Sequence, residues 1–305
     1  MTSILASMPN APYLEKTVVD RVVRTALDEE LFWESKLNKQ SVSGLTVLSY
    51  EDLYQDIETP NDEARGRNLN PEGRNPAMRS EHGMFPHTGI GEIEERVFKL
   101  LQFALEIDYT EEELTYTDLI NQVAKKQIKL GKQFGSYVNT FLGNKLTQGW
   151  NPTTIQSIKA KVAWDDDNFS AKPYQDILAA DKKLRMVNGR SYEAKDCFVS
   201  KNSFYDLAAW SAEKDYELSY SKPTSRVKSI EFMGINIAAT DMVKDGFAVM
   251  ADFAQCGTLY EAEPFKTRVY EKVENRTFHV QATRRFNYNL TDPKAVILIT
   301  HIATA

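Results

Sequence analysis

The last part of the chain reads FHVQATRRFNYNL over residues 278–290, TDPK over 291–294 and AVILI over 295–299. The first segment alternates apolar and polar side chains, which predicts a strand with one buried face. Thr291-Asp292-Pro293 is typical of a turn. The segment from Ala295 to Ile299 is wholly apolar, which is typical of a strand buried on both faces. The chain is therefore expected to end in the core of a β-sheet. Its apolar alternating positions are Phe278, Val280, Ala282, Phe286, Tyr288 and Leu290.

The region before this segment, from Trp150 to about Pro264, has a mixed α/β pattern. Helices are predicted where apolar residues recur at helical spacing, and strands where short apolar runs occur between turn signals. We interpret the region as a second domain inserted into the first. The predicted helices are Pro173–Val187 and Asn202–Lys214, and the predicted strands are Cys197–Val199, Ile230–Ala238 and Phe247–Phe253.

A long amphipathic helix is predicted before that domain. Its apolar face extends from Ile120 to Phe141, with Thr115 and Asp118 as an N-terminal capping pair and Gly143-Asn144 as a stop. Gly131 and Gly135 lie inside it, four residues apart, a spacing that permits close approach of another backbone. The alternating stretch Leu101–Tyr109 predicts a half-buried strand just before this helix.

The N-terminal half contains one long stretch without periodicity, from Thr59 to Gly91, rich in Gly, Pro and Arg. Uninterrupted loops of this length are usually functional or disordered. A strand at Leu45–Tyr50 and the strand at Leu101–Tyr109 are expected to be the arms of a hairpin with this loop at its tip. Residues 1–13 read as an irregular tail. Leu14–Trp33 predicts an amphipathic helix, packed either on its own domain or on a neighbouring subunit.

Composition excludes several classes of protein. The net charge is −6, from 37 basic and 43 acidic residues, without the basic excess expected of a protein that grips DNA. The longest apolar runs are too short to cross a bilayer, and no secretory signal is recognisable at the start. Cys197 and Cys256 are not at metal-ligand spacing, so we expect two buried thiols.

No catalytic motif is present: the sequence lacks phosphate-binding glycine loops, a G-x-S-x-G elbow and H-E-x-x-H. His82 and His87 with Glu81 are conceivable metal ligands, but a pair of solvated loop imidazoles is the simpler interpretation. Asp165–Asn168 offers oxygen ligands for a hard cation, or forms a solvated turn. Glu111-Glu112-Glu113 precedes the long helix, where a structural role at the helix start is expected.

The order of elements resembles that of the capsid proteins of tailed bacteriophages, the Hong Kong 97 fold. Gly246-Phe-Ala-Val-Met-Ala-Asp-Phe253 resembles the family's strand ending in Asp-Phe. Arg285-Phe-Asn-Tyr-Asn-Leu-Thr-Asp-Pro-Lys-Ala-Val296 is similar to its closing Arg…Pro-x-Ala-Val segment. Glu111–Leu114 followed by Thr117-Asp118-Leu119 is similar to the entry to the family's spine helix.

This resemblance implies an α+β fold with an N-arm, an E-loop, a P-domain built on the spine helix and a β-sheet, and an A-domain. The implied ranges are 1–45 for the N-arm, 46–58 for a strand entering the E-loop, 59–91 for the E-loop, 92–149 and 275–305 for the P-domain, and 150–274 for the A-domain. In such shells the E-loop lies over a neighbouring subunit. Arg65, Arg67, Arg74 and Arg79 are then expected to pair with carboxylates on that subunit.

The function implied is structural and not enzymatic, without a cofactor or a bound metal. The subunit would self-assemble through pentamers and hexamers into an icosahedral shell enclosing double-stranded DNA, without sequence-specific contacts and without a membrane. Its location would be the virion, after assembly in the host cytoplasm. A separate scaffolding protein and a portal are expected partners, and a decoration protein is left open. No lysine lies between Lys39 and Lys99, so the family's lysine–asparagine crosslink is not expected.

Two other functions compete with this interpretation. An encapsulin, a cellular protein compartment, shares the fold and uses an N-terminal helix on its inner wall. A metal-dependent hydrolase built around His82, His87 and the acidic runs is the third alternative. Particle contents distinguish the first rival from a virus, and metal analysis tests the second.

Overall fold

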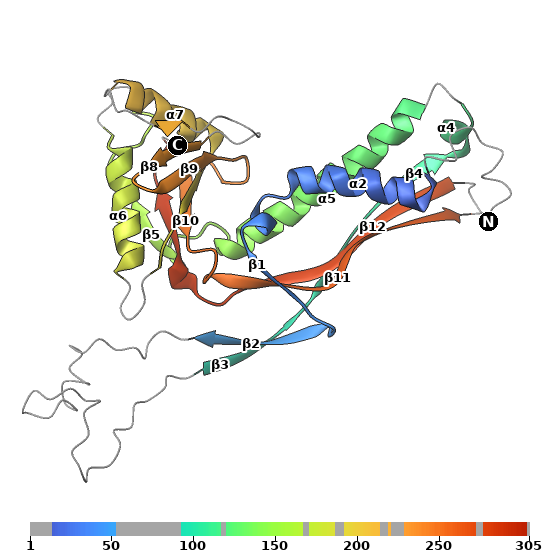
Figure 1. The fold of residues 1–305 in the computed structure, drawn as a ribbon, viewed down its shortest axis with the longest axis horizontal. Helices are drawn as coiled ribbons and strands as arrows, with labels where there is room; N and C mark the ends of the chain where they lie inside the picture. The colour runs from blue at the N-terminus through green and yellow to red at the C-terminus, as the bar shows by residue number, and fades with distance from the viewer. Residues whose placement is uncertain are drawn as a thin grey trace, which may run out of the picture. The chain divides into compact units, whose positions relative to one another are not determined.

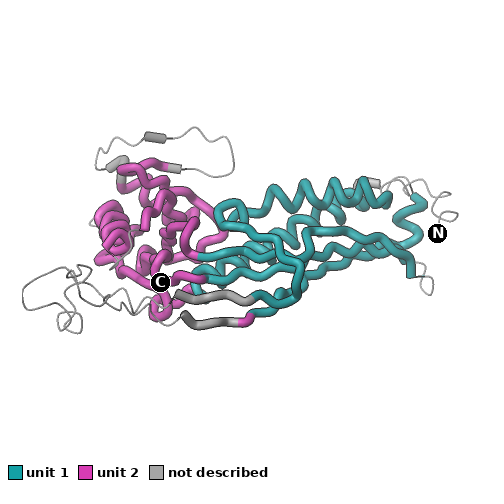
Figure 2. Tube along the Cα trace, turned by 60° about the horizontal axis from the view of Figure 1, so that its bottom comes forward, with its two compact units in different colours: residues 1–47, 98–149, 257–290 teal, residues 48–97, 150–256, 291–305 magenta. Residues whose placement is uncertain are grey.

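The structure is a computed structural model that describes residues 14–52, 93–116, 120–166, 171–186, 192–213, 219–220, 229–272 and 277–303. Two compact units are formed from interleaved parts of the chain (Figure 2). Unit 1 comprises residues 1–47, 98–149 and 257–290, and unit 2 comprises 48–97, 150–256 and 291–305. None of the described helices is both long and apolar enough to span a membrane.

Unit 1 is a four-stranded sheet with two helices on one of its faces (Figure 1). The strand order is β1-β11-β12-β4, in which only β1 runs parallel to its neighbour. The strands are β1 (Asn38–Ser41), β4 (Leu101–Thr110), β11 (Gly257–Lys272) and β12 (Thr277–Leu290). The helices are α2 (Lys16–Glu30), η2 (Trp33–Ser35), α4 (Glu111–Thr115) and α5 (Ile120–Leu146).

The helix predicted for Leu14–Trp33 is confirmed as α2, and it packs on α5 of its own chain. Its apolar stripe is buried at Val19, Val23, Ala26 and Leu27. Of the two alternatives for this stripe, packing within the subunit is therefore the one observed. The predicted strand Leu101–Tyr109 is confirmed as β4, whose alternate residues are more and less exposed.

The long helix ends later than predicted, and a separate short helix precedes it. Thr115 is the last residue of that helix, α4, whose capping box is made by Thr110 and Glu113, each accepting the other's backbone N–H with its side chain. Asp118, the other member of the predicted capping pair, lies outside the described residues. Lys126 lies 2.6 Å from Glu113, so the structural role expected for this acidic run is confirmed. The helix continues past Gly143 to Leu146 and ends in a Schellman-type cap, in which the N–H groups of Gln148 and Gly149 donate to the carbonyls of Lys145 and Asn144. Gln148, with a φ of 47°, is the left-handed residue of this cap.

Unit 2 is built on a seven-stranded mixed sheet of order β5-β13-β10-β6-β9-β8-β7. Its helices are α6 (Pro173–Arg185), which contacts β5 and β13, and α7 (Lys201–Glu213), which contacts β9. The strands are β5 (Gln156–Lys159), β6 (Asp196–Val199), β7 (Ser219–Tyr220), β8 (Ser229–Phe232), β9 (Ile235–Ala239), β10 (Phe247–Ala251) and β13 (Val296–Thr300), the last preceded by η5 (Pro293–Ala295).

Most of the elements predicted here are confirmed, but the single strand Ile230–Ala238 is wrong. It is a hairpin of β8 and β9, turned at Met233 and Gly234, which both have positive φ. The predicted all-apolar strand is confirmed as β13. All five of its residues are buried. Strands β10 and β5 pair with its two edges, and helix α6 contacts it.

The two compact units divide the chain differently from the expected domain ranges at two places. Residues 291–305 were expected with the P-domain but belong to unit 2, because the apolar strand β13 needs a neighbour on each side and a covered face. Strand β11, expected within 150–274, belongs to unit 1, where it pairs along its length with β12. The sequence pattern did not reveal β11 or β1.

The expected hairpin is also formed by different strands. Strand β2 (Thr46–Asp52) pairs with β3 (Ile93–Lys99) in a separate two-stranded sheet, whereas β4 pairs with β12 (Figure 1). Leu100, between β3 and β4, donates its N–H to Leu45 O. The returning arm is therefore β3, which had not been predicted. The E-loop expected at 59–91 lies outside the described residues.

Candidate functional site

The α2–α5 contact depends on two glycines of the long helix. A Cβ added at Gly131 would lie 2.5 Å from the carbonyl oxygen of Val23, and one at Gly135 would lie 2.7 Å from Cβ of Glu30. Both distances are below those that real Cβ atoms show. The prediction that these glycines permit close backbone approach is confirmed, and the approaching backbone is that of α2.

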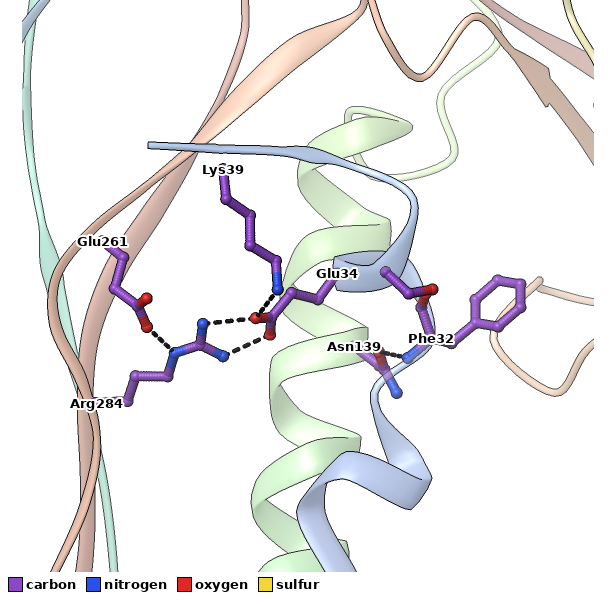
Figure 3. Close-up of polar contacts among 7 residues, drawn as sticks. Phe32, Glu34, Lys39, Asn139, Glu261 and Arg284 are labelled. Carbon is purple, nitrogen blue, oxygen red and sulfur yellow. Dashed lines mark hydrogen bonds and ion pairs between the residues drawn. The ribbon is translucent and has the colours of Figure 1, made fainter. Parts of the chain in front are cut away.

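Asn139 of α5 holds the end of α2. This residue is buried, and its Oδ1 accepts the N–H of Phe32 at 3.0 Å while its Nδ2 donates to the carbonyl of Glu30 at 2.5 Å. Both backbone groups belong to the chain leaving the helix, where carbonyls lack partners within the helix. One amide side chain therefore fixes where the chain turns out of α2 (Figure 3).

A buried arginine cluster follows directly, formed by Glu34, Lys39, Glu261 and Arg284 (Figure 3). Arg284 donates from Nη1 and Nη2 to the two oxygens of Glu34, at 2.5 and 2.8 Å. Its Nε donates to Glu261 at 2.7 Å, and Lys39 Nζ lies 2.7 Å from Glu34. Two cations thus balance two carboxylates, with Arg284 and Glu34 buried and Lys39 half-exposed.

Electrostatics stabilises the ionised form of this cluster. Burial would raise the pKa of Glu34, but hydrogen bonds and charges from Arg284 and then Lys39 outweigh it and lower the pKa below its ordinary value. Burial also opposes the charge of Arg284, yet Glu34 and Glu261 raise its pKa. The guanidinium further lies 4.9 Å from the ring centroid of Phe286, within the range of a cation–π contact.

A bulge in β11 makes room for Arg284. The register of β11 on β12 shifts between Glu263 and Lys266, so that Pro264 and Phe265 lie opposite Arg284 alone. Proline has no N–H to donate, which is compatible with an interrupted ladder and not with a regular one. The bulge therefore interrupts the sheet at the position where the charged side chain is buried.

Side chains of α2 bind the backbone around this bulge. Asp20 Oδ1 accepts from both the N–H and the hydroxyl of Thr267, at 3.2 and 2.6 Å. Arg24 Nη2 donates to the carbonyl of Phe265 at 3.3 Å. Helix α2 is thus bonded to the sheet as well as packed on α5. The N-terminal segment is held at three places along unit 1: at the bulge, at Asn139 and at Arg284.

The opposite face of the sheet carries a second polar group. Glu106 accepts from the hydroxyl of Tyr270 at 2.5 Å and lies 2.8 Å from Nδ1 of His279. The rings of Tyr270 and His279 stack with centroids 5.3 Å apart. The hydrogen bond from Tyr270 is the main cause that lowers the pKa of Glu106, and Glu106 in turn raises that of Tyr270. This group joins β4, β12 and β11.

An apolar groove of about 370 Å³ lies between α5 and β4. Its floor is aromatic: Phe103 stacks on Phe286 with centroids 4.6 Å apart, and Phe141 packs edge-on against Phe103 at 5.0 Å. Tyr137 at its rim is 59% exposed. The lining residues are Phe103, Ala104, Leu105, Phe134, Tyr137, Thr140, Phe141 and Asn144.

The residues singled out from the sequence fall in three groups. Those of the loop, namely Arg65, Arg67, Arg74, Arg79, His82 and His87, lie outside the described residues, as do Asp167 and Asn168. Asp165 and Asp166 are described, and within the described ranges no three His, Cys, Asp or Glu side chains form a metal-binding group. Cys197 and Cys256 are confirmed as buried free thiols, and burial raises the pKa of Cys197 to about 12.

Two of the three family-like segments contribute carboxylates with structural roles in unit 2. The Asp252 carboxylate accepts from the backbone of Glu193 and Ala254 and from the Gln255 amide. Asp292 accepts from the N–H of Lys294 and from the hydroxyl of Tyr192. Both carboxylates therefore order the turns that follow strands β10 and β12.

The arginine cluster was missed in the sequence. Its signal is nevertheless present, because Arg284 occupies an apolar position in the alternation between Ala282 and Phe286. A charged residue in the buried phase of a strand predicts a buried partner. The partner, Glu34, is 250 residues away in the chain, and no local pattern identifies it.

No family model and no curated protein matches this sequence. Solved structures do match. The capsid of cyanophage P-SCSP1u superposes with a TM-score of 0.63 and 10% identity, covering 90% of this chain and 89% of that one. A virus-like particle from Pyrococcus furiosus gives 0.58 and 8%, covering 92% and 97%. An encapsulin complex from Synechococcus elongatus gives 0.56 and 8%, covering 89% and 87%.

These matches extend over nearly the full length of each chain, although the identities are low. They agree with the fold described above. One unit has a long helix on a sheet, the other is an α/β unit, and each is made of stretches that alternate along the chain. The chain therefore has the capsid fold of the Hong Kong 97 type.

Proposed function

We propose that this chain is the major capsid protein of a tailed virus, a structural subunit that assembles through pentamers and hexamers into an icosahedral shell around double-stranded DNA. The match to the cyanophage capsid over about nine tenths of both chains carries the proposal. Unit 1 would be the P-domain and unit 2 the A-domain. The proposed role is structural, and the clusters found among the described residues support it because they join elements of the fold to one another.

The test is assembly of the purified full chain, alone and coexpressed with its neighbouring genes. We expect pentamers, hexamers or shells in sedimentation and negative-stain microscopy. A profile that contains only compact monomer at micromolar concentration, even with a scaffolding protein supplied, would exclude the proposal. Scaffolding protein, portal, a decoration protein and assembly in the host cytoplasm belong to the same proposal.

The loop arginines would supply contacts between subunits. Arg65, Arg67, Arg74 and Arg79 occur in a segment without an apolar pattern, and guanidinium groups form paired hydrogen bonds with carboxylates. Trypsin should cut the segment 59–91 quickly in free subunits and slowly in shells. Equal rates in both states would argue against contacts on a neighbouring subunit.

An encapsulin is the second candidate, because an encapsulin complex is among the structural matches. The intramolecular packing of α2 on α5 is compatible with a helix on an inner wall. Native particles decide between the two: nuclease-protected double-stranded DNA supports the viral capsid, and a protein cargo without DNA supports the compartment.

A further inference from the structure

Helix α5 has an unusual charge for this protein. Its 27 residues include five lysines and no aspartate or glutamate, in a chain whose net charge is −6. Most solvent-exposed helices of globular proteins mix both signs, which gives favourable pairs at spacings of three and four. The lysines are Lys125, Lys126, Lys129, Lys132 and Lys145.

Three of these residues, Lys125, Lys129 and Lys132, form one lysine face. Their spacing of four and then three puts them on the same side of the helix, over about 10 Å of its axis. Lys125 and Lys129 are exposed and Lys132 is half-buried. Lys126 differs, because it pairs with Glu113 and lies 5.2 Å from the ring centroid of Tyr109.

The lysine face has no counter-charge bonded to it among the described residues. Throughout the described ranges, no side chain or carbonyl forms an ion pair or hydrogen bond with Lys125, Lys129 or Lys132. Three exposed residues between and beside them carry no charge: Gln122 and Gln133 are hydrogen-bond donors, and Ile128 is apolar. Neighbouring α2 has nearly balanced charges, with three basic and four acidic residues over Lys16–Glu30.

Helix stability does not account for this arrangement. Lysines three and four residues apart repel one another, and the helix dipole favours cations at the C-terminal end, whereas the lysine face lies in the N-terminal half of α5. An external polyanion would relieve that repulsion. Lysine acts as a mobile point charge for phosphates and is depleted in protein–protein interfaces, so nucleic acid is favoured over an acidic protein.

We propose that the lysine face of α5 binds the phosphate backbone of double-stranded DNA, without reading its sequence. The inference rests on the proposed function, which supplies packaged DNA. B-DNA presents one negative charge per about 1.7 Å of its axis, so three lysines spread over about 10 Å meet several phosphates. Gln122 and Gln133 can donate further hydrogen bonds to phosphate oxygens, which position a duplex without reading bases.

The opposite side of unit 1 provides the contrast. Lys266, Arg268 and Lys272 of β11 alternate with Thr267, which faces α2, and therefore lie on the other face of the sheet. Glu106 on that face lies 3.7 Å from Lys272, so positive charge there is partly balanced. A polyanion should prefer the helix side.

The test is lysine acetylation of unassembled full-length subunits, read by mass spectrometry, with a short duplex of arbitrary sequence as the probe. At about 50 mM salt the duplex should protect Lys125, Lys129 and Lys132 and leave Lys266 reactive. Three phosphate contacts predict a loss of affinity of about 40-fold between about 50 and 200 mM salt. The variant Lys125→Gln/Lys129→Gln/Lys132→Gln should lose this salt-dependent binding, and the matched variant Lys266→Gln/Arg268→Gln/Lys272→Gln should retain it.

Polyglutamate is the second probe. Protection by polyglutamate and not by DNA would overturn the proposal in favour of an acidic protein partner, and absence of protection by either probe, or equal protection of Lys266, would also overturn it. Shell formation by the wild type and both variants is followed in parallel by electron microscopy. Shells without lysine protection contradict this inference alone, whereas absence of shells contradicts the proposed function.

Discussion

Arg284 and Glu34 are 250 positions apart in the sequence and are joined by two hydrogen bonds, from Nη1 at 2.5 Å and Nη2 at 2.8 Å. Both side chains are almost completely buried, so their charges must be satisfied by each other, by Glu261 and by Lys39. A buried pair of this kind contributes little compared with a well-packed apolar pair, but losing one partner leaves a buried charge without compensation. The contact therefore makes the N-terminal segment dependent on β12.

Replacing Arg284 should weaken unit 1 strongly. Arg284→Met leaves the Glu34 carboxylate buried with only the half-exposed Lys39, and we expect a loss of about 3–5 kcal/mol in the free energy of unfolding. Urea unfolding followed by tryptophan fluorescence measures it. Arg285→Met, next along the strand and paired with the exposed Glu263, should cost less than about 1 kcal/mol. Equal effects of the two substitutions would contradict the assignment.

Removing both charges should be tolerated better than removing one. In Glu34→Gln/Arg284→Met no carboxylate remains unpaired at the centre of the cluster, so the double variant should recover part of the stability lost in Arg284→Met. The same urea titration provides the comparison. If the losses of the single variants simply add, the two residues do not act as a pair.

The cluster should also make stability depend on pH. The pKa of Glu34 is lower in the folded state than its ordinary value of 4.5, so the folded state binds this proton less readily than the unfolded state. The stabilisation is fully present above the unfolded pKa and is lost as pH falls through the folded pKa. The urea midpoint of Glu34→Gln should therefore fall less than that of the wild type between about pH 6 and pH 3. Parallel curves would show that Glu34 does not contribute.

Gly131→Ala should destabilise the protein even though alanine favours helices. The added methyl would lie 2.5 Å from the Val23 carbonyl oxygen and 2.8 Å from Cβ of Ala26, and overpacking of this kind costs about 1–3 kcal/mol. Helix propensity returns at most about 1 kcal/mol. Ser136→Ala, exposed on the same helix, is the control and should be neutral. A more stable Gly131→Ala protein would mean that α2 does not approach α5 so closely.

Phe134→Asp should prevent folding. Phe134 is 1% exposed and packs edge-on against Phe265 at 5.3 Å between ring centroids, so aspartate would bury a charge without a partner at a cost of several kcal/mol. We expect insoluble protein on expression. Tyr137→Asp, one turn away at the exposed rim of the groove, should remain soluble. A soluble Phe134→Asp protein would show that this face of α5 is not in the core.

The shell should be held together without covalent bonds. Both cysteines are buried, so neither sulfur is exposed to a neighbouring subunit, and burial raises the pKa of Cys197 to about 12. The sequence has no lysine between Lys39 and Lys99 for an isopeptide bond from the loop. Particles boiled in detergent with reductant should give a single band near 34.7 kDa. A ladder of larger species that persists under these conditions would require another crosslinking pair.

Local sequence patterns were sufficient to predict an element when its own geometry sets the spacing of its buried residues. The spacing of three and four in α2 and α5, the period of two in β4 and β12, and the unbroken apolar run of β13 each follow from the geometry of a single element. The glycines of α5 likewise predicted a close backbone approach from their spacing alone. The absence of catalytic motifs and the order of the elements indicated the fold class.

Strand β11 was not predicted because its apolar and polar residues do not alternate regularly. Its register on β12 shifts twice, Pro264 resembles a strand breaker, and charged residues such as Glu261 and Glu263 interrupt any apolar face. The pairing energy of β11 comes from β12 and β1, and its bulge is bonded by α2. Of these partners only β12 is near β11 in sequence, whereas β1 and α2 belong to the N-terminal segment.

The sequence by itself therefore determined the helices, most strands, the buried thiols and the order of elements that predicts a capsid fold. Tertiary structure decided that β13 joins unit 2, that β3 is the partner of β2, that α2 packs within its own subunit, and that Arg284 is buried against Glu34. The physical reason is range: periodicity records which face of one element avoids water, whereas strand partners and buried charge pairs depend on residues brought together only when the chain folds.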